Sequence, residues 1–272
     1  MLNSDLDTSS SPRQPAVAGQ FYPADSESLR ASVSRYLSAA EPIHPAPKAI
    51  IAPHAGYMFS GAVAGYAYAG WQDLGTAVRR IVLLGPAHRF YLRGMAVPAA
   101  RQFLTPLGAV DVDQDAILEL ANRPDMTIDN RPHADEHSLE VQLPFLQMLF
   151  PAFTLVPIVV GIDNGESVAA VLEQLWGEDD TRIVISSDLS HYHNYYEARQ
   201  IDAATSAAIC ALQSEAIGPE QACGCMPLRG LLTYARQHGL QINELDRRNS
   251  GDTAGPRDQV VGYGAYAIQT PA

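Results

Sequence analysis

IVLLG at residues 81–85, LVPIVVG at 155–161 and IVISS at 183–187 are continuous apolar runs rich in β-branched residues. This pattern is typical of strands that are buried on both faces, as in the centre of a parallel sheet, because neither face alternates toward water. Residues 49–53 and 260–268 have a similar composition. The sequence therefore predicts a central, mostly parallel β-sheet.

Segments with helical spacing lie between these runs. Leu29, Val33 and Leu37 share one face of a predicted helix, and Asp25 and Ser26 provide a start signal before it. Further helices are expected at 137–150, 168–175, 201–212 and 228–237. Strands that alternate with helices predict a single α/β domain whose sheet is flanked by helices.

Three segments depart from this alternation. The short alternating runs at 94–98 and 109–113, separated by RQFLTPLG, are expected to form a β-ribbon after the second strand. The polar segment NELDRRNSGDTAGPRD at 243–258 is expected to be a long surface loop before the last strand. Residues 1–12, MLNSDLDTSSSP, are expected to be a flexible tail, which leaves residues 13–272 as the domain.

Composition and charge exclude several classes of protein and partner. The 272 residues are 47% apolar with a mean hydropathy of −0.07, which excludes a disordered chain. With 18 Lys and Arg against 30 Asp and Glu, the net charge of −12 disfavours nucleic acid and anionic membranes as partners. No secretory signal or spanning segment is recognisable, and Cys210, Cys223 and Cys225 are too few for a disulfide framework. We expect a cytoplasmic protein.

Imidazoles and carboxylates follow three of the predicted strands. They are His54 after the run at 49–53, His88 after IVLLG, and Asp188, Ser190, His191 and His193 after IVISS. Ligand sites in open parallel sheets lie outside the carboxyl ends of the strands, where loops converge. A single histidine at a strand end is more often structural, but the coincidence at three strand ends favours a shared site.

Such a cluster is suited to binding a transition metal. Neutral imidazoles ligate iron, zinc and copper, and two of them with one anionic ligand leave positions open for substrate or oxygen. The anionic ligand could be Asp188, Glu136, Glu140 or a cysteine thiolate. Cys223 and Cys225 precede the predicted helix at 228–237, where the helix dipole would stabilise a thiolate. The other interpretation is that these cysteines are small buried apolar residues.

Further candidate residues flank these motifs. Glu136 and His137, in the segment DEHSLEVQLPFL, could reach the same cleft, although acidic residues also commonly occupy a first helical turn. Aromatic side chains near the motifs could be core packing or the wall of a pocket for an aromatic ligand: Phe21, Tyr22, Tyr57, Phe59, Tyr192, Tyr195 and Tyr196.

Six motifs in this order resemble the Memo family, whose microbial members are described as AmmeMemoRadiSam system protein B. They are PAVAGQFYP, IAPHAGYMFSG, LLGPAH, DEHSLEVQLPFL, ISSDLSHY and CG-x-MP, and they extend from residue 15 to residue 227. The resemblance implies an α/β fold similar to the class III extradiol dioxygenases, which are non-haem iron(II) enzymes. It also implies that His54, His88 and Cys223 hold a pocket metal, iron or copper, and that Asp188 and His191 lie in the same pocket.

Cys225 departs from the family pattern, in which the cysteine is followed by glycine and then by a proline three positions after that glycine. The pattern selects Cys223, and leaves Cys225 as a second soft ligand, an oxidation partner or a packing residue. A thiolate in place of the carboxylate that the dioxygenases use favours softer or more oxidised metals, so their reaction does not transfer directly to this chain.

These observations lead to three hypotheses. The first is a redox protein or oxygenase that uses Fe(II), with Cu or Zn as alternatives, on a small aromatic substrate, with His191 as general acid or base and Asp188 orienting it. Glu136, His137, Glu140, Phe21, Tyr57, Phe59 and Cys225 would line or support this pocket. The second is a non-catalytic module that binds a peptide or partner. The third is a hydrolase that uses either Cys223 as nucleophile with His191 as base, or a zinc-activated water. Family context implies AMMECR-like and radical S-adenosylmethionine proteins as partners.

Overall fold

The structure is a computed structural model that describes residues 6–163 and 165–271. Its strands are β1 (Ala49–Ala52), β2 (Arg80–Pro86), β3 (Met95–Val97), β4 (Gln102–Thr105), β5 (Gly108–Val112), β6 (Met126–Ile128), β7 (Thr154–Val160), β8 (Thr181–Ser186), β9 (His191–His193), β10 (Gln241–Asn249) and β11 (Val260–Gln269). The helices are α1 (Ser26–Ser38), α2 (Tyr57–Ala69), α3 (Gln114–Leu120), α4 (Arg131–Ala134), α5 (His137–Glu140), α6 (Leu143–Leu149), α7 (Gly165–Leu175), α8 (Tyr195–Cys210) and α9 (Cys225–Gln237).

The strands form one mixed sheet with the order β10-β11-β1-β8-β2-β7-β3-β6. Its centre, β1-β8-β2-β7, is parallel, and antiparallel pairs occur toward its edges. The three apolar runs that predicted the fold are the central strands β2, β7 and β8, which are buried along nearly their whole length. The predicted α/β architecture with a mostly parallel central sheet is confirmed.

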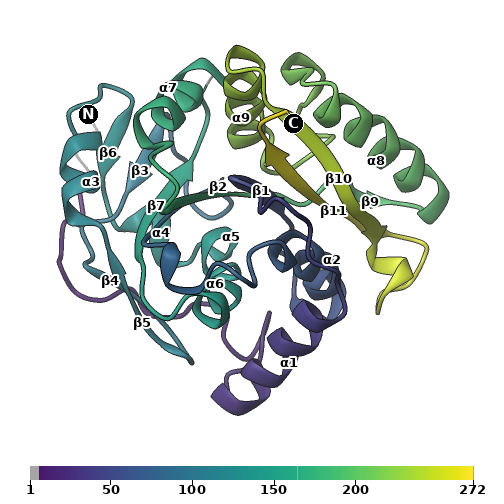
Figure 1. The fold of residues 1–272 in the computed structure, drawn as a ribbon, viewed down its shortest axis with the longest axis horizontal. Coiled ribbons are helices and arrows are strands. Elements are labelled where there is room, and N and C mark those ends of the chain that lie inside the picture. Colours follow the sequence, from purple (N-terminus) through teal and green to yellow (C-terminus); the bar gives the residue numbers. More distant parts are fainter. Residues whose placement is uncertain (1–5, 164, 272) are drawn as a thin grey trace.

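Helices cover both faces of this sheet. Figure 1 shows α7 and α9 on one side of the central strands and α1, α2 and α6 on the other. The α1 helix follows the predicted spacing, since Leu29, Val33 and Leu37 are its buried residues and the Asp25 side chain caps it by accepting from the Ser28 N–H. Within the described residues, no helix is long and apolar enough to cross a membrane.

The predicted β-ribbon pairs differently from the expectation. Residues 109–113 lie largely in β5, but β5 pairs with β4, which lies inside the segment RQFLTPLG that was expected to be the connection. Residues 94–98 contribute β3, which pairs with β6 and β7 instead. The tight turn between Thr105 and Gly108, where Gly108 has a φ of +121°, closes a shorter hairpin than the sequence suggested.

The predicted loop at 243–258 is wrong for its first half. Residues 243–249 belong to β10, an antiparallel edge strand paired with β11. After Asn249 the chain forms a short 3-10 helix, Ser250–Asp252, and then turn and loop. An edge strand with partly exposed side chains can carry charged residues, so its sequence lacks the apolar pattern of a central strand.

Two helical segments also differ from the prediction. The expected helix 137–150 is divided into α5 and α6, because Pro144 has no N–H to donate to the carbonyl of Glu140. Helix α2 was not predicted, since YMFSGAVAGYAYA is apolar or small on every side and shows no helical period. Gly65 allows α1 and α2 to approach closely, because a Cβ there would lie 2.4 Å from the Tyr36 carbonyl oxygen.

The N-terminal segment contacts the loop that precedes α4. Residues 1–5 of the predicted tail and residue 272 of the predicted domain lie outside the described residues. Further along, the Asn130 N–H donates to the Asp7 carbonyl at 2.8 Å, and the Asn130 side chain donates to the Ser9 carbonyl at 2.8 Å. These bonds hold part of the segment 6–12 against the domain.

Candidate metal centre

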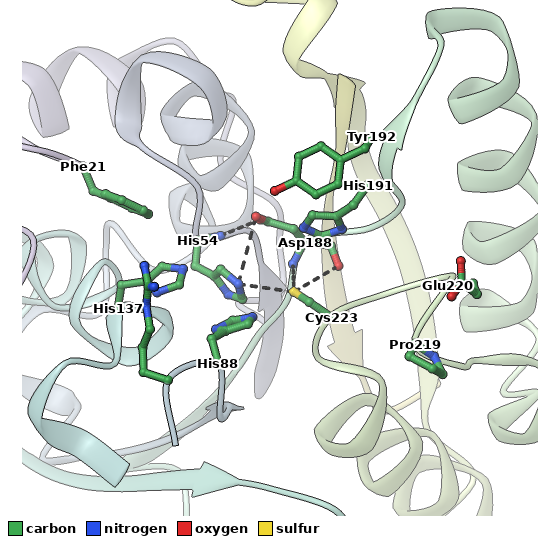
Figure 2. Close-up of a pocket in the computed structure, with 11 residues that line it drawn as sticks. Phe21, His54, His88, His137, Asp188, His191, Tyr192, Pro219, Glu220 and Cys223 are labelled. Carbon is green, nitrogen blue, oxygen red and sulfur yellow. Dashed lines mark hydrogen bonds and ion pairs between the residues drawn. The ribbon is translucent and has the colours of Figure 1, made fainter. Parts of the chain in front are cut away.

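The candidate site lies at the carboxyl ends of three neighbouring parallel strands. β1, β8 and β2 are adjacent in the sheet, and they are followed within a few residues by His54, Asp188 and His88 respectively. Cys223 comes from the loop before α9, which meets the same edge (Figure 2). These residues line a cavity of about 580 Å³, hereafter the main cavity.

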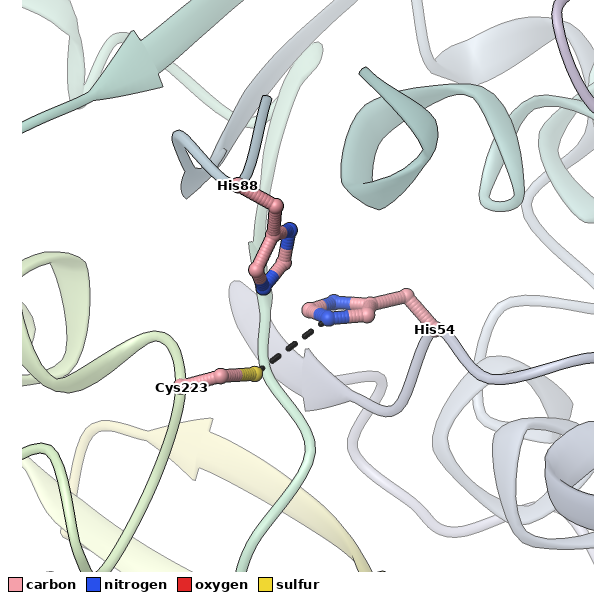
Figure 3. A group of neighbouring side chains, drawn as sticks. All are labelled: His54, His88 and Cys223. Atoms are coloured by element: carbon pink, nitrogen blue, oxygen red, sulfur yellow. Dashed lines mark hydrogen bonds between the residues drawn. The ribbon is translucent and has the colours of Figure 1, made fainter. Parts of the chain in front are cut away.

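His54, His88 and Cys223 present their ligand atoms to one another. One potential ligand atom from each residue lies within 4.8 Å of the other two, and His54 Nε2 is 3.3 Å from Cys223 Sγ (Figure 3). Two imidazoles and a sulfur at this separation are what a transition-metal ion requires of its ligands. The fold thus brings together residues 54, 88 and 223 in an arrangement that could hold a metal ion.

Hydrogen bonds fix the imidazole of His54 with Nε2 toward this centre. Ser186 Oγ donates to the Ser138 carbonyl at 2.6 Å, so it accepts from His54 Nδ1–H at 2.8 Å. Gln142 Nε2 also donates to Ser186 Oγ, at 2.9 Å. Burial, together with the charges of neighbouring histidines, holds the pKa of His54 well below its usual range. His54 is therefore a neutral imidazole whose Nε2 lone pair faces Cys223.

His88 is oriented by the buried carboxylate of Glu136. Glu136 accepts from His88 Nδ1 at 2.9 Å, from the His88 backbone N–H at 2.6 Å, and from the Ser138 N–H at 2.9 Å. Burial alone raises the pKa of Glu136, but the hydrogen bonds and charge of His88 outweigh it and lower that pKa to about 2. A carboxylate that accepts Nδ1–H leaves Nε2 free as a ligand atom and raises its basicity.

A second group of possible ligands, His88, Glu136 and His137, overlaps the first. His137 Nδ1 lies 3.3 Å from a Glu136 oxygen but is not aligned for a hydrogen bond. We favour the first group because the Glu136 carboxylate already accepts the three hydrogen bonds described above. His137 instead stacks on His88, with ring centroids 4.8 Å apart, and forms part of the cavity wall.

The Cys223 thiol is enclosed by the loop after β8. The Asp188 N–H donates to Cys223 Sγ at 3.3 Å, and a Cβ at Gly224 would lie 2.6 Å from Ser187 Cβ. Burial and then the negative charge of Asp188 raise the pKa of the Cys223 thiol. Without a bound cation the sulfur is thus a protonated thiol rather than a thiolate at neutral pH.

Asp188 and His191 also line the main cavity, and Asp188 Oδ2 lies 4.0 Å from His54 Nε2. Asp188 Oδ1 accepts from the His54 backbone N–H at 2.8 Å, and burial raises the pKa of Asp188 although the charge of His191 opposes this. His191 Nδ1 lies 2.8 Å from the Leu189 carbonyl, an acceptor, so Nδ1 carries the proton and Nε2 is the free acceptor. His191 can therefore accept a proton at Nε2.

The remaining predicted residues divide between the pocket and other parts of the molecule. Phe21 and His137 line the main cavity, whereas Phe59 lines only a neighbouring cavity. Glu140 binds Arg13, the Tyr22 hydroxyl and two backbone N–H groups. The buried Tyr57 donates to the Val141 carbonyl at 2.8 Å, and His193 pairs with Glu197 at 3.3 Å. Cys225 lines an apolar cavity that shares Cys223 and Pro219 with the main cavity. Neither Glu140, Tyr57, Cys225 nor His193 lines the main cavity.

Several residues of the site were not predicted from the sequence. Ser186 and Gln142 support His54, yet Ser186 reads as the end of a buried strand and Gln142 as part of a helix. Arg89, Pro219 and Glu220 line the main cavity. The one local signal for these residues was a polar residue, Ser186, at the end of a buried apolar run.

The family is shown by comparison with known proteins. The family model for Memo-like proteins matches residues 13–267. The chain belongs to the Memo-like protein family. A MEMO1 family protein of Methanosarcina mazei is 36% identical over 274 residues, which covers 94% of this chain and 99% of the relative. A MEMO1 family protein of Archaeoglobus fulgidus is 37% identical over 271 residues, with coverage of 94% and 99%. The resemblance inferred from the six motifs is thereby confirmed.

A solved structure also aligns with much of this chain. An uncharacterized protein from Escherichia coli K12 aligns with a TM-score of 0.47 and 14% identity, covering 81% of this Memo-like chain and 99% of that chain. A likeness at this level says nothing about chemistry.

Proposed function

We propose that this Memo-like protein is a non-haem metal-dependent redox protein or oxygenase whose centre is His54, His88 and Cys223. One observation carries the proposal: three ligand atoms from three separate loops lie within 4.8 Å of one another at the wall of an open cavity. Fe(II) is the metal we propose, with copper and then zinc as alternatives. The substrate would be a small, flat organic molecule bound in the main cavity.

The donor set fits such a metal. Two neutral imidazoles suit iron, copper and zinc, and a thiolate shifts the preference toward softer or more oxidised ions. The hydrogen bonds that His54 and His88 donate to Ser186 and Glu136 match those that orient metal-bound histidines in general, since each fixes Nδ1 and leaves Nε2 free. When bound, the metal would supply Lewis acidity and one-electron chemistry.

The chain's own residues would bind the substrate and move a proton. His191 Nε2 is a free acceptor in the main cavity, and the bond from Nδ1 to the Leu189 carbonyl keeps the ring in that orientation. A base held in this way could take a proton from an acidic substrate hydroxyl. Asp188, by accepting the His54 N–H, holds the loop after β1 in place and so positions His54.

The state of the thiol disfavours a hydrolase that uses Cys223 as nucleophile. A cysteine nucleophile needs a lowered pKa and a base aligned on the sulfur, whereas burial raises the pKa of Cys223. His54 Nε2 lies 3.3 Å from Sγ, and the pKa of His54 is itself lowered by burial. A neutral thiol beside a poor base suits a metal ligand better than a nucleophile.

Metal titrations of protein purified without oxygen test the proposal. Fe(II), Cu(I) and Zn(II) are added to wild type, His54→Ala and Cys223→Ser, with Cys225→Ser as the matched control two residues away. We expect a single high-affinity site that both ligand variants lose and the control keeps. Equal binding by all four proteins would refute the centre. If the metal binds but no oxygen is consumed with any substrate, the non-catalytic binding hypothesis is favoured.

A further inference from the structure

Tyr192 has a backbone conformation that normally belongs to glycine. Its φ is +64°, and six of the eight positive-φ residues in the described part of the chain are glycines. The left-handed region is costly for a residue with a Cβ, and for a bulky side chain it marks either strain or function. Tyr192 is also strongly exposed, at 71%, so burial of its ring in the core does not account for its presence.

Tyr192 is the extra residue of a β-bulge. In the pairing of β9 with β11, Val260 is opposite His193 and Val261 is opposite His191, and the register shifts between the two pairs. The backbone is held just before this point, since the Leu189 N–H donates to Gly262 and the Gly262 N–H donates to Ser190, both at 2.8 Å. Bulges of this kind often re-aim a side chain beside an active site.

The bulge places the Tyr192 side chain between two cavities. It lines the main cavity and also a second one of about 450 Å³, hereafter the side cavity. The two cavities share Phe21, His137, Asp188, His191 and Tyr192, so they adjoin along a common boundary. In Figure 2, Phe21 lies on the side of the pocket formed by His137, and Tyr192 lies on the side formed by His191.

The side cavity is the more aromatic of the two. Phe59 and Tyr263 line it in addition to Phe21 and Tyr192, whereas the main cavity carries the candidate metal ligands and Arg89. Rigid aromatic faces bind flat rings well, because stacked and edge-to-face contacts add to the hydrophobic gain. A ligand that fills both cavities would be larger than a single ring.

We propose that Tyr192 is a specificity-determining residue that, with Phe21, holds a flat, extended aromatic substrate across the boundary of the two cavities. The reacting group of this substrate faces the candidate metal centre, and its distal ring occupies the side cavity. The inference deepens the proposed function by naming its substrate class, and it rests on that function only for the identity of the reacting end.

Two ring-deleting variants separate the role of the ring from that of the backbone. Tyr192→Gly and Tyr192→Ala both remove the ring, but only glycine relieves the left-handed conformation. Because little packing is lost at so exposed a position, Tyr192→Gly is expected to melt about 2 °C above Tyr192→Ala. Tyr196→Ala is the matched control, since Tyr196 is 74% exposed and lines neither cavity.

The binding probe is 2-naphthol, a flat fluorescent bicyclic alcohol, titrated into metal-free protein, with the saturated and non-planar decahydro-2-naphthol as the comparison. We expect the naphthol Kd to rise about threefold to tenfold in both ring-deleting variants, and to stay unchanged in Tyr196→Ala. The saturated alcohol should bind weakly to every protein and show no such difference.

Three results would overturn this inference: no naphthol binding by wild type, equal binding by the Tyr192 variants, or an equal loss in Tyr196→Ala. Fe(II) titration of the same proteins distinguishes failure of the aromatic site from failure of the proposed function. If the ring-deleting variants lose naphthol affinity while no metal binds at His54 and Cys223, the aromatic site is supported and the metal centre is refuted. If metal binds normally and the naphthol Kd is the same with and without the Tyr192 ring, the metal centre is supported and the aromatic site is refuted.

Discussion

Glu136→Gln provides the most direct test of how the centre is supported. In the wild type one carboxylate oxygen accepts from His88 Nδ1 and Ser138 N–H, and the other accepts from the His88 N–H at 2.6 Å. A glutamine can keep its carbonyl oxygen at the first position only by directing its amide N–H₂ at the His88 N–H. One hydrogen bond is then replaced by two donors that face each other, which destabilises the folded arrangement by about 1–3 kcal/mol of free energy.

The consequence for metal binding follows from the orientation of His88. Loss of a supporting carboxylate typically weakens metal affinity by about 10- to 100-fold, and we expect a decrease in that range. The assay is Zn(II) titration against a chromophoric chelator at pH 7. Asp135→Asn is the control, because it removes the same charge at the adjacent, exposed residue. An affinity within about twofold of wild type in Glu136→Gln would refute the assigned role of Glu136.

The same variant has a predicted effect on acid stability. The pKa of Glu136 falls from an ordinary 4.5 to about 2 in the folded protein, which corresponds to about 3 kcal/mol of stability at neutral pH. A lowered carboxyl pKa stabilises the fold above pH 4.5, and that contribution is lost as the pH falls toward 2. Urea unfolding at pH 6 and pH 3 should therefore show a smaller acid loss in Glu136→Gln than in wild type. An equal loss in both proteins would contradict the lowered pKa.

Three further outcomes are expected. Metal uptake at pH 7 should release a proton, because burial raises the pKa of the Cys223 thiol; an indicator dye in weak buffer measures this, and no release would mean that the thiolate is already present. Gly224→Ala should lower the free energy of unfolding in urea by about 1–3 kcal/mol and weaken metal binding, since its Cβ would lie 2.6 Å from Ser187 Cβ. The control Gly218→Ala should change neither quantity, because its Cβ would meet only the Gln221 side chain, at 3.1 Å. Glu140→Ala should cost about 3–5 kcal/mol of unfolding free energy because it leaves the Arg13 guanidinium buried without its partner, while exposed Glu119→Ala should leave the urea midpoint unchanged.

Much of the architecture could be read from local patterns. The central strands β2, β7 and β8 were recognisable because burial on both faces removes the polar alternation of an exposed strand. The ribbon and the edge strand were not recognisable from the sequence. The strands β4, β5 and β10 have mixed hydrophobic patterns, and their pairing depends on which strands lie beside them. Helix α2 was missed for a related reason: it is packed on nearly every side, so its sequence has no polar face.

The strand-end rule placed His54, His88, Asp188 and His191 at one edge of the sheet without any structure, because the carboxyl ends of parallel strands must meet there. It could not choose among the anionic candidates, which depends on contacts between residues far apart in the chain. Tertiary packing commits Glu140 to Arg13 and Tyr22, Glu136 to His88, and Asp188 to the His54 N–H. The Cys223 sulfur then lies 3.3 Å from the Nε2 atom of His54, closer than Asp188 Oδ2, which lies 4.0 Å from it. The sequence determined which edge of the sheet carries the candidate site. Packing decided which side chains remain available there to bind a metal, because each buried charge must first be satisfied by its neighbours.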